Sequence, residues 1–594
     1  MHPKLHRSLF GITAICIFVY LLIRCFTVPI SHDEAATFFH YIQSGKFIPY
    51  YALWDANNHF LNSLLVYPLY KLFGSDLIWL RLPNLLFFWV YAYFAYKLSG
   101  SIKNNFLQVT TSIALITAPF LIEFFAQTRG YGMSFALMMG AIYWLNSFLK
   151  THLASHQLFT WLFIILALSA NMSLMNSYLL IMGSIALILL FKTEKFSTKS
   201  NWIVFLVFGF IPFLAATKYA LDMKEMRLLY YGLGDGLVPV TVKSLLKFGF
   251  NANSIPLAWI VATVGFLVSV VLIISFARRH FNNANPGTIT AVLLLGNAVG
   301  AILLNLIMGV NFPEDRIALY FLPLFVISFG YCIDLAQRGL PSFKWAGLLL
   351  WAFPISLLAQ LNLNHTLQWH DLAVSNKVYE FVKSEQEKMD EPLIISGYRL
   401  LEMSWGYNNV RSENLITPFA HNKRDTLHIS DYVLCYAPTC SEYGDDYTEV
   451  FHDESNMKIL KRKAPIELDF LYEPEMPLFF ADKVEYHDVL DLSTDSIIKQ
   501  ANMVEIELKL SSEAAPLNTD LIITSSNSSN SNLYYDFIPL KWVRNSWNGE
   551  TLKIRRPIAL PLSSERLLIY LWNVEKAEQK IEVKSVKLFR VEPQ

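Results

Sequence analysis

Four short stretches of this sequence place carboxylates, histidines and arginines beside long apolar runs. They are "SHDEA" at 31–35, "NNHFLN" at 57–62, "AQTRGYG" at 126–132 and "NFPEDRIALYFLP" at 311–323. A carboxylate can take a proton from an attacking hydroxyl group, and arginine can stabilise a phosphate leaving group that gains charge in the transition state. If the fold brings these stretches together, their chemistry suits transfer of a sugar from a lipid phosphate.

The composition of the chain is that of a protein with many membrane spans. Of its 594 residues, 54% are hydrophobic and 15% aromatic, which is too apolar for a soluble protein of this length. The 48 basic and 48 acidic residues cancel, so no overall field favours nucleic acid as a partner. Apolar runs long enough for helices occur near 9–28, 77–97, 106–125, 131–149, 158–171, 174–191, 202–220, 257–277, 289–310, 317–335 and 344–360. The sequence therefore predicts a polytopic α-helical membrane domain of about eleven spans.

The charges of the short loops predict which side each loop faces. With the N-terminus inside, the inner loops carry one acid, Glu194, against many bases: Lys4, Arg7, Lys97, Lys103, Lys150, Lys192, Lys195, Lys199, Arg278, Arg279, Arg338 and Lys344. This asymmetry follows the positive-inside rule. We therefore expect a multi-pass protein of the cytoplasmic (inner) membrane, with the loops at 31–58 and 222–254 and all residues after 361 on the outer face.

The residues after the last apolar run have the composition of a soluble protein. We expect a membrane domain over 1–365, followed by a small α/β domain over 366–465, where "DLAVSNKVYEFVKSEQEK" has helical spacing and "EPLIISGY" is typical of a buried strand. From 466 to 594, alternating stretches such as "MVEIELKL" and "LLIYLW" predict a β-sandwich-like domain. Cys435 and Cys440 could form a small disulfide outside the cytosol, or remain two free thiols.

The chain resembles the GT-C class of integral-membrane glycosyltransferases, in particular the branch with protein O-mannosyltransferases and lipid A aminoarabinose transferases. The resemblance rests on "HDEA" after the first expected helix, "FGSDLIWLRLPN" leading into the second, "AQTRGYG" opening the fourth, and Arg316, Tyr320 and Pro323 in "RIALYFLP". These motifs cover roughly the first 330 residues in the expected order. The resemblance implies a GT-C-like membrane domain and a polyprenyl-phosphate sugar as donor.

The same resemblance implies roles for individual residues. Asp33 would be the general base with Glu34 as its supporting acid, and Arg129 and Arg316 would bind the donor phosphate. Three further side chains are possible substrate contacts: His59, Tyr131 and Tyr320. The chain departs from the family at "NNHFLN", where relatives often have Lys-Pro-Pro-Leu or His-Pro-Pro-Leu. Both prolines are missing, and the basic position aligns with either Asn58 or His59.

Each group of residues also has an alternative interpretation. Asp33 and Glu34 could be helix-start acids that complement the dipole of a following helix, and Arg129 and Arg316 could anchor lipid headgroups in general. His32, His40 and His59 stand near two acids and could ligate a divalent metal. No tight ligand spacing supports a metal, so no metal or other cofactor is expected.

The predicted function is glycosyl transfer at the outer face of the cytoplasmic membrane. A hexosyl or pentosyl group would pass from a polyprenyl-phosphate donor to a hydroxyl of a lipid, glycan or protein acceptor, with membrane lipids as further partners. One alternative is a lipid or glycan transporter, which would need ionisable groups within its spans that these runs mostly lack. The other is a membrane-anchored sugar-binding protein, which would need neither about eleven spans nor an acid pair and two arginines on one face.

Overall fold

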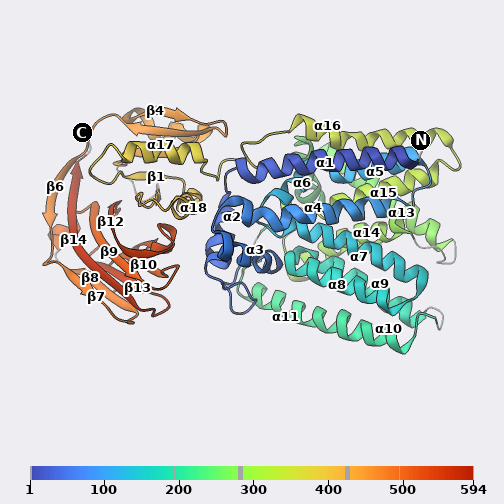
Figure 1. Cartoon of the computed structure of the whole chain (residues 1–594), viewed down its shortest axis with the longest axis horizontal. Helices are drawn as coiled ribbons and strands as arrows, with labels where there is room; N and C mark the ends of the chain where they lie inside the picture. The colour runs from blue at the N-terminus through green and yellow to red at the C-terminus, as the bar shows by residue number, and fades with distance from the viewer. Residues whose placement is uncertain are drawn as a thin grey trace. The chain divides into compact units, whose positions relative to one another are not determined.

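The computed structural model describes residues 3–191, 195–229, 231–278, 285–421, 428–493 and 495–592. The chain forms two compact units (Figure 1). The first comprises Met1–Thr27 and His40–Leu363, and the second Val28–Phe39 and Asn364–Gln594. Lys192, Glu194 and Arg279, which contribute to the predicted charge pattern, lie outside the described residues.

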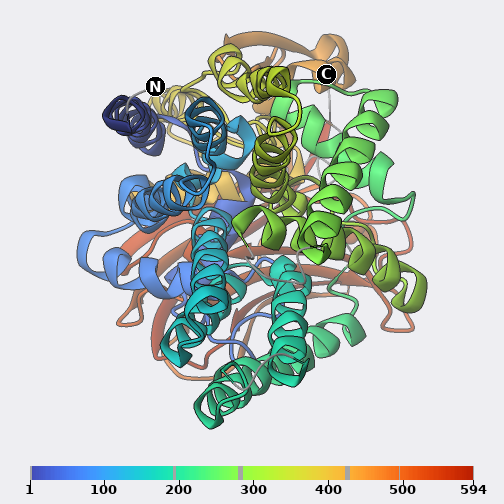
Figure 2. The ribbon, with the colours of Figure 1, turned by 90° about the vertical axis from the view of Figure 1, so that its right-hand side faces the viewer.

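The first unit is a bundle of apolar helices, as the sequence predicts, and the protein is a multi-pass membrane protein. Figure 2 views these helices nearly end on. Within the described ranges, nine helices are long and apolar enough to cross a membrane. They comprise α1 (Pro3–Thr27), α4 (Leu77–Ser99), α7 (Tyr131–Thr151), η3 with α9 (Met172–Leu174, Met175–Phe191), α10 to α11 (Lys199–Val204, Phe205–Phe210, Ile211–Glu225), α13 (Ile255–Ala277), α14 (Pro286–Met308), η6 with α15 (Asp315–Ala318, Phe321–Ala336), and η7 with α16 (Pro341–Trp351, Ala352–Ala359).

The two remaining apolar runs are helical but do not meet the same criterion. The fifth run is the 17-residue helix α8 (Ala154–Ala170). The third run is broken into α5 (Asn105–Ile116) and α6 (Pro119–Ile122) with η2 (Glu123–Ala126), which meet at a bend of 50°. Pro119 causes the break, because a proline ring disfavours helical backbone at the preceding residue, and Ala118 is extended with ψ 107°. Counting the bent pair as one span gives up to ten in the described chain.

Shorter elements complete the N-terminal part of the chain. Those that carry candidate residues or their neighbours are α2 (His32–Thr37), η1 (Phe38–Gln43), α3 (Phe60–Phe73), η5 (Val238–Val242) and α12 (Lys243–Phe250). Pro68 lies inside α3 and Pro83 inside α4.

The second unit is rich in strands, which confirms the predicted change of fold class after the membrane helices. A mixed sheet has the order β2-β1-β3-β5-β4, formed by β1 (Ile395–Gly397), β2 (Ala420–His421), β3 (Tyr432–Tyr436), β4 (Tyr447–His452) and β5 (Met457–Arg462). Helices α17 (Asn376–Gln386) and α18 (Glu402–Ser412) belong to this part. Glu385 of α17 accepts hydrogen bonds from Lys388 and from the Tyr432 hydroxyl, the latter at 2.6 Å.

Two further sheets form a sandwich. One has the order β11-β10-β13-β8 and the other β12-β9-β14-β6, with β7 paired to β14. Their strands are β6 (Glu467–Tyr472), β7 (Leu478–Phe480), β8 (Tyr486–Leu492), β9 (Met503–Ser512), β10 (Thr519–Ser526), β11 (Asn532–Pro539), β12 (Trp547–Pro557), β13 (Arg566–Asn573) and β14 (Gln579–Glu592). A core of aliphatic side chains packs between the sheets. The predicted domain limits stay predictions, and the first sheet lies between 395 and 462 and the sandwich strands between 467 and 592.

Cys435 of β3 and Cys440 of η10 (Ala437–Asp446) form a disulfide. This is one of the two states that the sequence left open.

Candidate functional site

The "AQTRGYG" turn joins η2 to the start of α7, and Asn84 of α4 fixes its backbone. The Asn84 amide donates to the carbonyl oxygens of Gln127 at 2.9 Å and of Arg129 at 2.5 Å, and its oxygen accepts from the Met133 amide at 3.1 Å. A buried backbone group without a partner is costly, so these bonds stabilise one conformation of the turn. The asparagine of "LRLPN" therefore positions the segment that carries Arg129.

A second set of polar contacts connects this turn to the first helix. Arg24 and Glu123 form an ion pair at 3.1 Å, with each side chain 3% exposed, and Glu123 also accepts from Gln127 Nε2 at 3.2 Å. Arg81 donates to the carbonyl oxygens of Arg24 and Cys25 at 3.3 Å each. Removing one partner of a buried pair leaves an uncompensated charge, so these groups are structural supports of the turn.

Arg129 lies among residues of "NNHFLN". It is 1% exposed, donates from Nη1 to Asn57 Oδ1, and its guanidinium lies 5.6 Å from the centre of the Tyr131 ring. Asn62 Nδ2 donates to the Thr128 carbonyl oxygen at 3.3 Å. Two of the stretches identified in the sequence therefore come together around Arg129.

His59 packs against the same turn. Its Nδ1 lies 2.7 Å from the Ala170 carbonyl oxygen, and its ring meets the Tyr131 ring edge-on at 4.8 Å. A Cβ at Gly130 would lie 1.9 Å from that carbonyl oxygen and 2.9 Å from His59 Nδ1. Only glycine fits here, and the contact to the carbonyl gives His59 a structural role whatever its role toward substrate.

Arg316 lies beside a tyrosine that the sequence did not identify. Its Nη1 donates to the Tyr231 hydroxyl at 2.6 Å, its guanidinium lies 4.2 Å from that ring centre, and the hydroxyl donates to Asp315 Oδ2 at 3.2 Å. Burial raises the pKa of Tyr231, Arg316 opposes this, and Asp315 and Tyr131 raise it further. The phenol is neutral at pH 7, and its hydroxyl connects Arg316 to Asp315.

Two lysines add positive charge near Arg316. Burial raises the pKa of Glu314, as does Asp315, whereas Lys247, Arg316 and Lys243 lower it. Both lysines belong to α12. The region around Arg316 therefore offers several cations to an anionic group.

Tyr320, the remaining candidate of the first unit, is 2% exposed and its ring stacks on Phe321 at 4.6 Å between centres.

The two acids of "SHDEA" have different environments at the start of α2. Ser31 is the N-cap and forms a capping box with Glu34, whose Oε2 accepts from the Ser31 amide at 3.2 Å while Ser31 Oγ accepts from the Glu34 amide at 3.4 Å. Glu34 is fully buried. The alternative interpretation as a helix-start acid thus describes the geometry of Glu34. Asp33 is not part of the box and is partly exposed.

Segment Val28–Phe39 belongs to the second unit and is held there by specific bonds. His32 donates its amide to the Leu372 carbonyl at 3.0 Å, and its Nδ1 lies 2.8 Å from the Leu400 carbonyl oxygen. Ser404 Oγ donates to the Ile30 carbonyl at 3.0 Å. Asp33 and Glu34 are therefore positioned by the second unit, while the other five candidates belong to the first unit.

The described residues contain no group of three or more His, Cys, Asp or Glu side chains arranged to hold a metal ion. The expectation that no cofactor is needed stays a prediction.

Several supporting residues were missed by sequence reasoning. Asn57 and Asn84 lie in stretches that the sequence analysis had already identified, so both could have been predicted as supporting residues. Tyr231 lies 85 positions from Arg316, and Arg24 lies 99 positions from Glu123. The local spacing of residues in the sequence does not indicate either of these two contacts.

Comparison with known proteins gives matches at the level of structure. No family model matches the chain, and no curated protein matches its sequence. It is similar to ArnT from Cupriavidus metallidurans bound to undecaprenyl phosphate, with 9% identity and a TM-score of 0.44 over 77% of this chain and 98% of that chain. It is also similar to the archaeal oligosaccharyltransferase AglB from Archaeoglobus fulgidus, in complex with an inhibitory peptide and a dolichol-phosphate, with 9% identity and a TM-score of 0.41 over 95% of this chain and 94% of that one.

A third similar structure is arabinosyltransferase EmbB from Mycobacterium smegmatis, with 8% identity and a TM-score of 0.38 over 100% of this chain and 65% of that chain. All three are GT-C glycosyltransferases, the class that the sequence motifs resemble. At TM-scores below 0.5 these similarities define no correspondence between individual residues.

Proposed function

We propose that this protein is a glycosyltransferase that moves a sugar from a polyprenyl-phosphate donor to a hydroxyl group of a lipid, glycan or protein acceptor. The observation that carries the proposal is the presence of two buried arginines, each over a tyrosine ring, in the stretches that the sequence singled out. Arg129 lies over Tyr131, and Arg316 lies over Tyr231.

The chemistry of this region supports the proposed phosphate-binding role. Guanidinium groups bind phosphate oxygens through paired, charge-assisted hydrogen bonds. The Tyr231 hydroxyl accepts from Arg316 and donates to Asp315, which holds the guanidinium in place, and Lys243 and Lys247 add positive charge. These groups would stabilise the carrier phosphate as it departs with the electron pair of the broken bond to the sugar.

Asp33 is proposed as the general base. The acceptor oxygen attacks the anomeric carbon, its proton passes to the Asp33 carboxylate, and the bond between the anomeric carbon and the phosphate oxygen breaks. Glu34 is bound in the capping box, so we propose that its support is indirect. It fixes the first turn of α2 and thereby the direction of Asp33.

The cytoplasmic membrane, with the second unit outside, is the proposed location. Basic residues in the short loops support an inner N-terminus. The Cys435–Cys440 disulfide supports an oxidising, extracytoplasmic environment for the second unit.

The proposal is tested by incubating purified protein with a panel of polyprenyl-phosphate hexoses and pentoses and measuring release of the polyprenyl phosphate. We expect cleavage of at least one donor, with a marked loss in Arg316→Ala. Arg338→Ala is the matched control, because Arg338 follows α15 whereas Arg316 precedes it. Arg338 forms an ion pair with Asp334 at 3.1 Å. Folded wild-type protein that cleaves none of the donors would refute the proposal.

A further inference from the structure

The outer face of the sheet β11-β10-β13-β8 carries an unusual set of side chains. Alternate residues such as Leu521, Ile523 and Ile569 enter the sandwich core, so their neighbours along each strand point to the other face. This outer face carries five aromatic residues, which we call the aromatic face: Tyr486, Tyr535, Phe537, Tyr570 and Trp572.

The aromatic face is ordered and accessible. Tyr486 and Trp572 stack with 14° between their planes and 6.2 Å between their centres, and Tyr486 lies 5.9 Å from Tyr570. Tyr535 lies 6.3 Å from Phe537. Tyr486 is 51% and Tyr535 46% exposed. A contiguous exposed apolar patch with polar residues beside it is typical of a binding surface.

Carboxylates stand between the rings. The strand register places Asp488 beside Tyr570 and Asp520 beside Trp572. Asp520 Oδ1 is buried and has no hydrogen-bond partner among the described residues. Because a buried polar atom normally has a partner, the Asp520 carboxyl group, which is partly exposed, is a candidate partner for a ligand hydroxyl.

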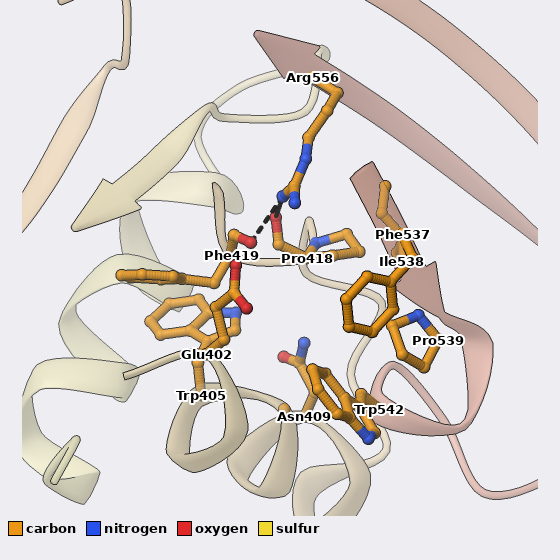
Figure 3. Close-up of a pocket in the computed structure, with 11 residues that line it drawn as sticks. Glu402, Trp405, Asn409, Pro418, Phe419, Phe537, Ile538, Pro539, Trp542 and Arg556 are labelled. Carbon is orange, nitrogen blue, oxygen red and sulfur yellow. Dashed lines mark hydrogen bonds between the residues drawn. The ribbon is translucent and has the colours of Figure 1, made fainter. Parts of the chain in front are cut away.

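The rings continue toward the acid pair within the same unit. Phe537 lies 6.1 Å from Trp542, and Trp542 lies 5.5 Å from Phe39, two residues beyond the end of α2. Phe537 and Trp542 also line a cleft with Trp405 and Asn409 of α18 (Figure 3). The cleft is small, with a cavity volume of about 20 Å³, and it opens to solvent. A continuous series of rings thus leads from the aromatic face to the segment that carries Asp33.

We propose that the aromatic face binds the acceptor, and that this acceptor carries a neutral saccharide chain. The inference rests on the proposed function, because it assigns the acceptor class of that reaction. A sugar ring has apolar C–H faces that pack on aromatic rings and hydroxyl edges that donate to carboxylates. An acyl chain would offer no hydroxyl groups to the carboxyl groups of Asp488 and Asp520, whereas a saccharide would.

The test measures saccharide binding by the full-length protein in detergent, independently of turnover. The probes are neutral hexasaccharides of glucose, mannose and N-acetylglucosamine, with oligogalacturonate as the anionic comparison. Tyr486→Ala and Tyr535→Ala should each weaken binding of the preferred neutral probe by roughly 2- to 10-fold, and Asp520→Asn should weaken it as well. Phe479→Ala is the control, since Phe479 is 68% exposed on β7 at the other sheet.

The outcomes separate this inference from the proposed function. Binding of a neutral probe that falls in the aromatic-face variants and not in Phe479→Ala supports the inference, whether or not a donor has been found. Donor cleavage by a protein that binds none of the probes overturns the inference and leaves the function intact. Variants with lowered thermal stability and unchanged saccharide binding would also overturn the inference. That result would show that the aromatic residues stabilise the fold and do not bind saccharide.

Discussion

Replacing Arg129 tests the proposed donor site, and the expected loss of donor affinity can be calculated from the hydrogen bonds that the guanidinium would form. Arg129→Ala removes a charged group that would bind phosphate through hydrogen bonds worth about 1.5–3 kcal/mol. Since about 1.36 kcal/mol corresponds to a factor of ten, the dissociation constant of the donor should rise by roughly 10- to 150-fold. Arg129→Lys should recover part of this loss, because a lysine retains the charge without the planar fork.

The contacts of Arg129 also predict a stability effect that has to be separated from binding. The side chain is 1% exposed and donates to Asn57 Oδ1, so its removal leaves a partly buried acceptor without this donor at a cost of about 1–3 kcal/mol. Asn57→Ala is the matched control. It removes the same hydrogen bond but keeps the guanidinium, so it should lower thermal stability while changing donor affinity only a few-fold.

The assay is equilibrium binding of a radiolabelled polyprenyl-phosphate sugar to purified protein, corrected for the folded fraction by size-exclusion chromatography. If Arg129→Ala binds the donor as tightly as wild type, Arg129 is a structural or lipid-anchoring residue and the reasoning fails. If Asn57→Ala weakens binding as much as Arg129→Ala, the effect comes from the shape of the turn and not from the charge.

Three further predictions concern the second unit. Glu34→Ala should lower the free energy of unfolding by about 0.5–2 kcal/mol through loss of the capping box with Ser31, and equal thermal stability of variant and wild type would contradict this role. The pKa of Glu385 is lowered to about 2, first by its lysine hydrogen bond and then by its tyrosine hydrogen bond. Its stabilising effect is therefore present above about pH 4.5 and lost as the pH falls toward 2, so the stability gap between wild type and Glu385→Gln in thermal unfolding should close over this range. Cys435 and Cys440 should react with a membrane-impermeant maleimide on intact cells only after reduction, and labelling that requires cell lysis would place the unit inside.

The helical and strand-rich parts of the fold could be predicted because each has a local signature. Long apolar runs give spans, and strict alternation such as that in Leu521 and Ile523 gives strands with one buried face. The break at Pro119 was readable in principle, since a proline restricts the residue before it. The hydropathy of the 106–125 run concealed it, because the two halves together are apolar enough for one span.

The environment of the candidate residues was less predictable because it depends on pairs distant in sequence. The attachment of "SHDEA" to the second unit rests on bonds such as that between Ser404 and Ile30, 374 positions apart. The pairing of Arg316 with Tyr231 likewise needs two loops to meet. By contrast, the capping box of Ser31 and Glu34 is a local pattern and could have been identified from spacing alone.

The most direct test of the central claim is single-turnover sugar transfer by Asp33→Asn with saturating donor. The substitution keeps the size of the side chain and removes the proton acceptor. We predict that transfer falls by about 10²- to 10⁴-fold, while donor affinity and thermal stability stay at wild-type values. An Asp33→Asn protein that transfers sugar at the wild-type rate would contradict the assignment of Asp33 as general base, and with it the proposed mechanism.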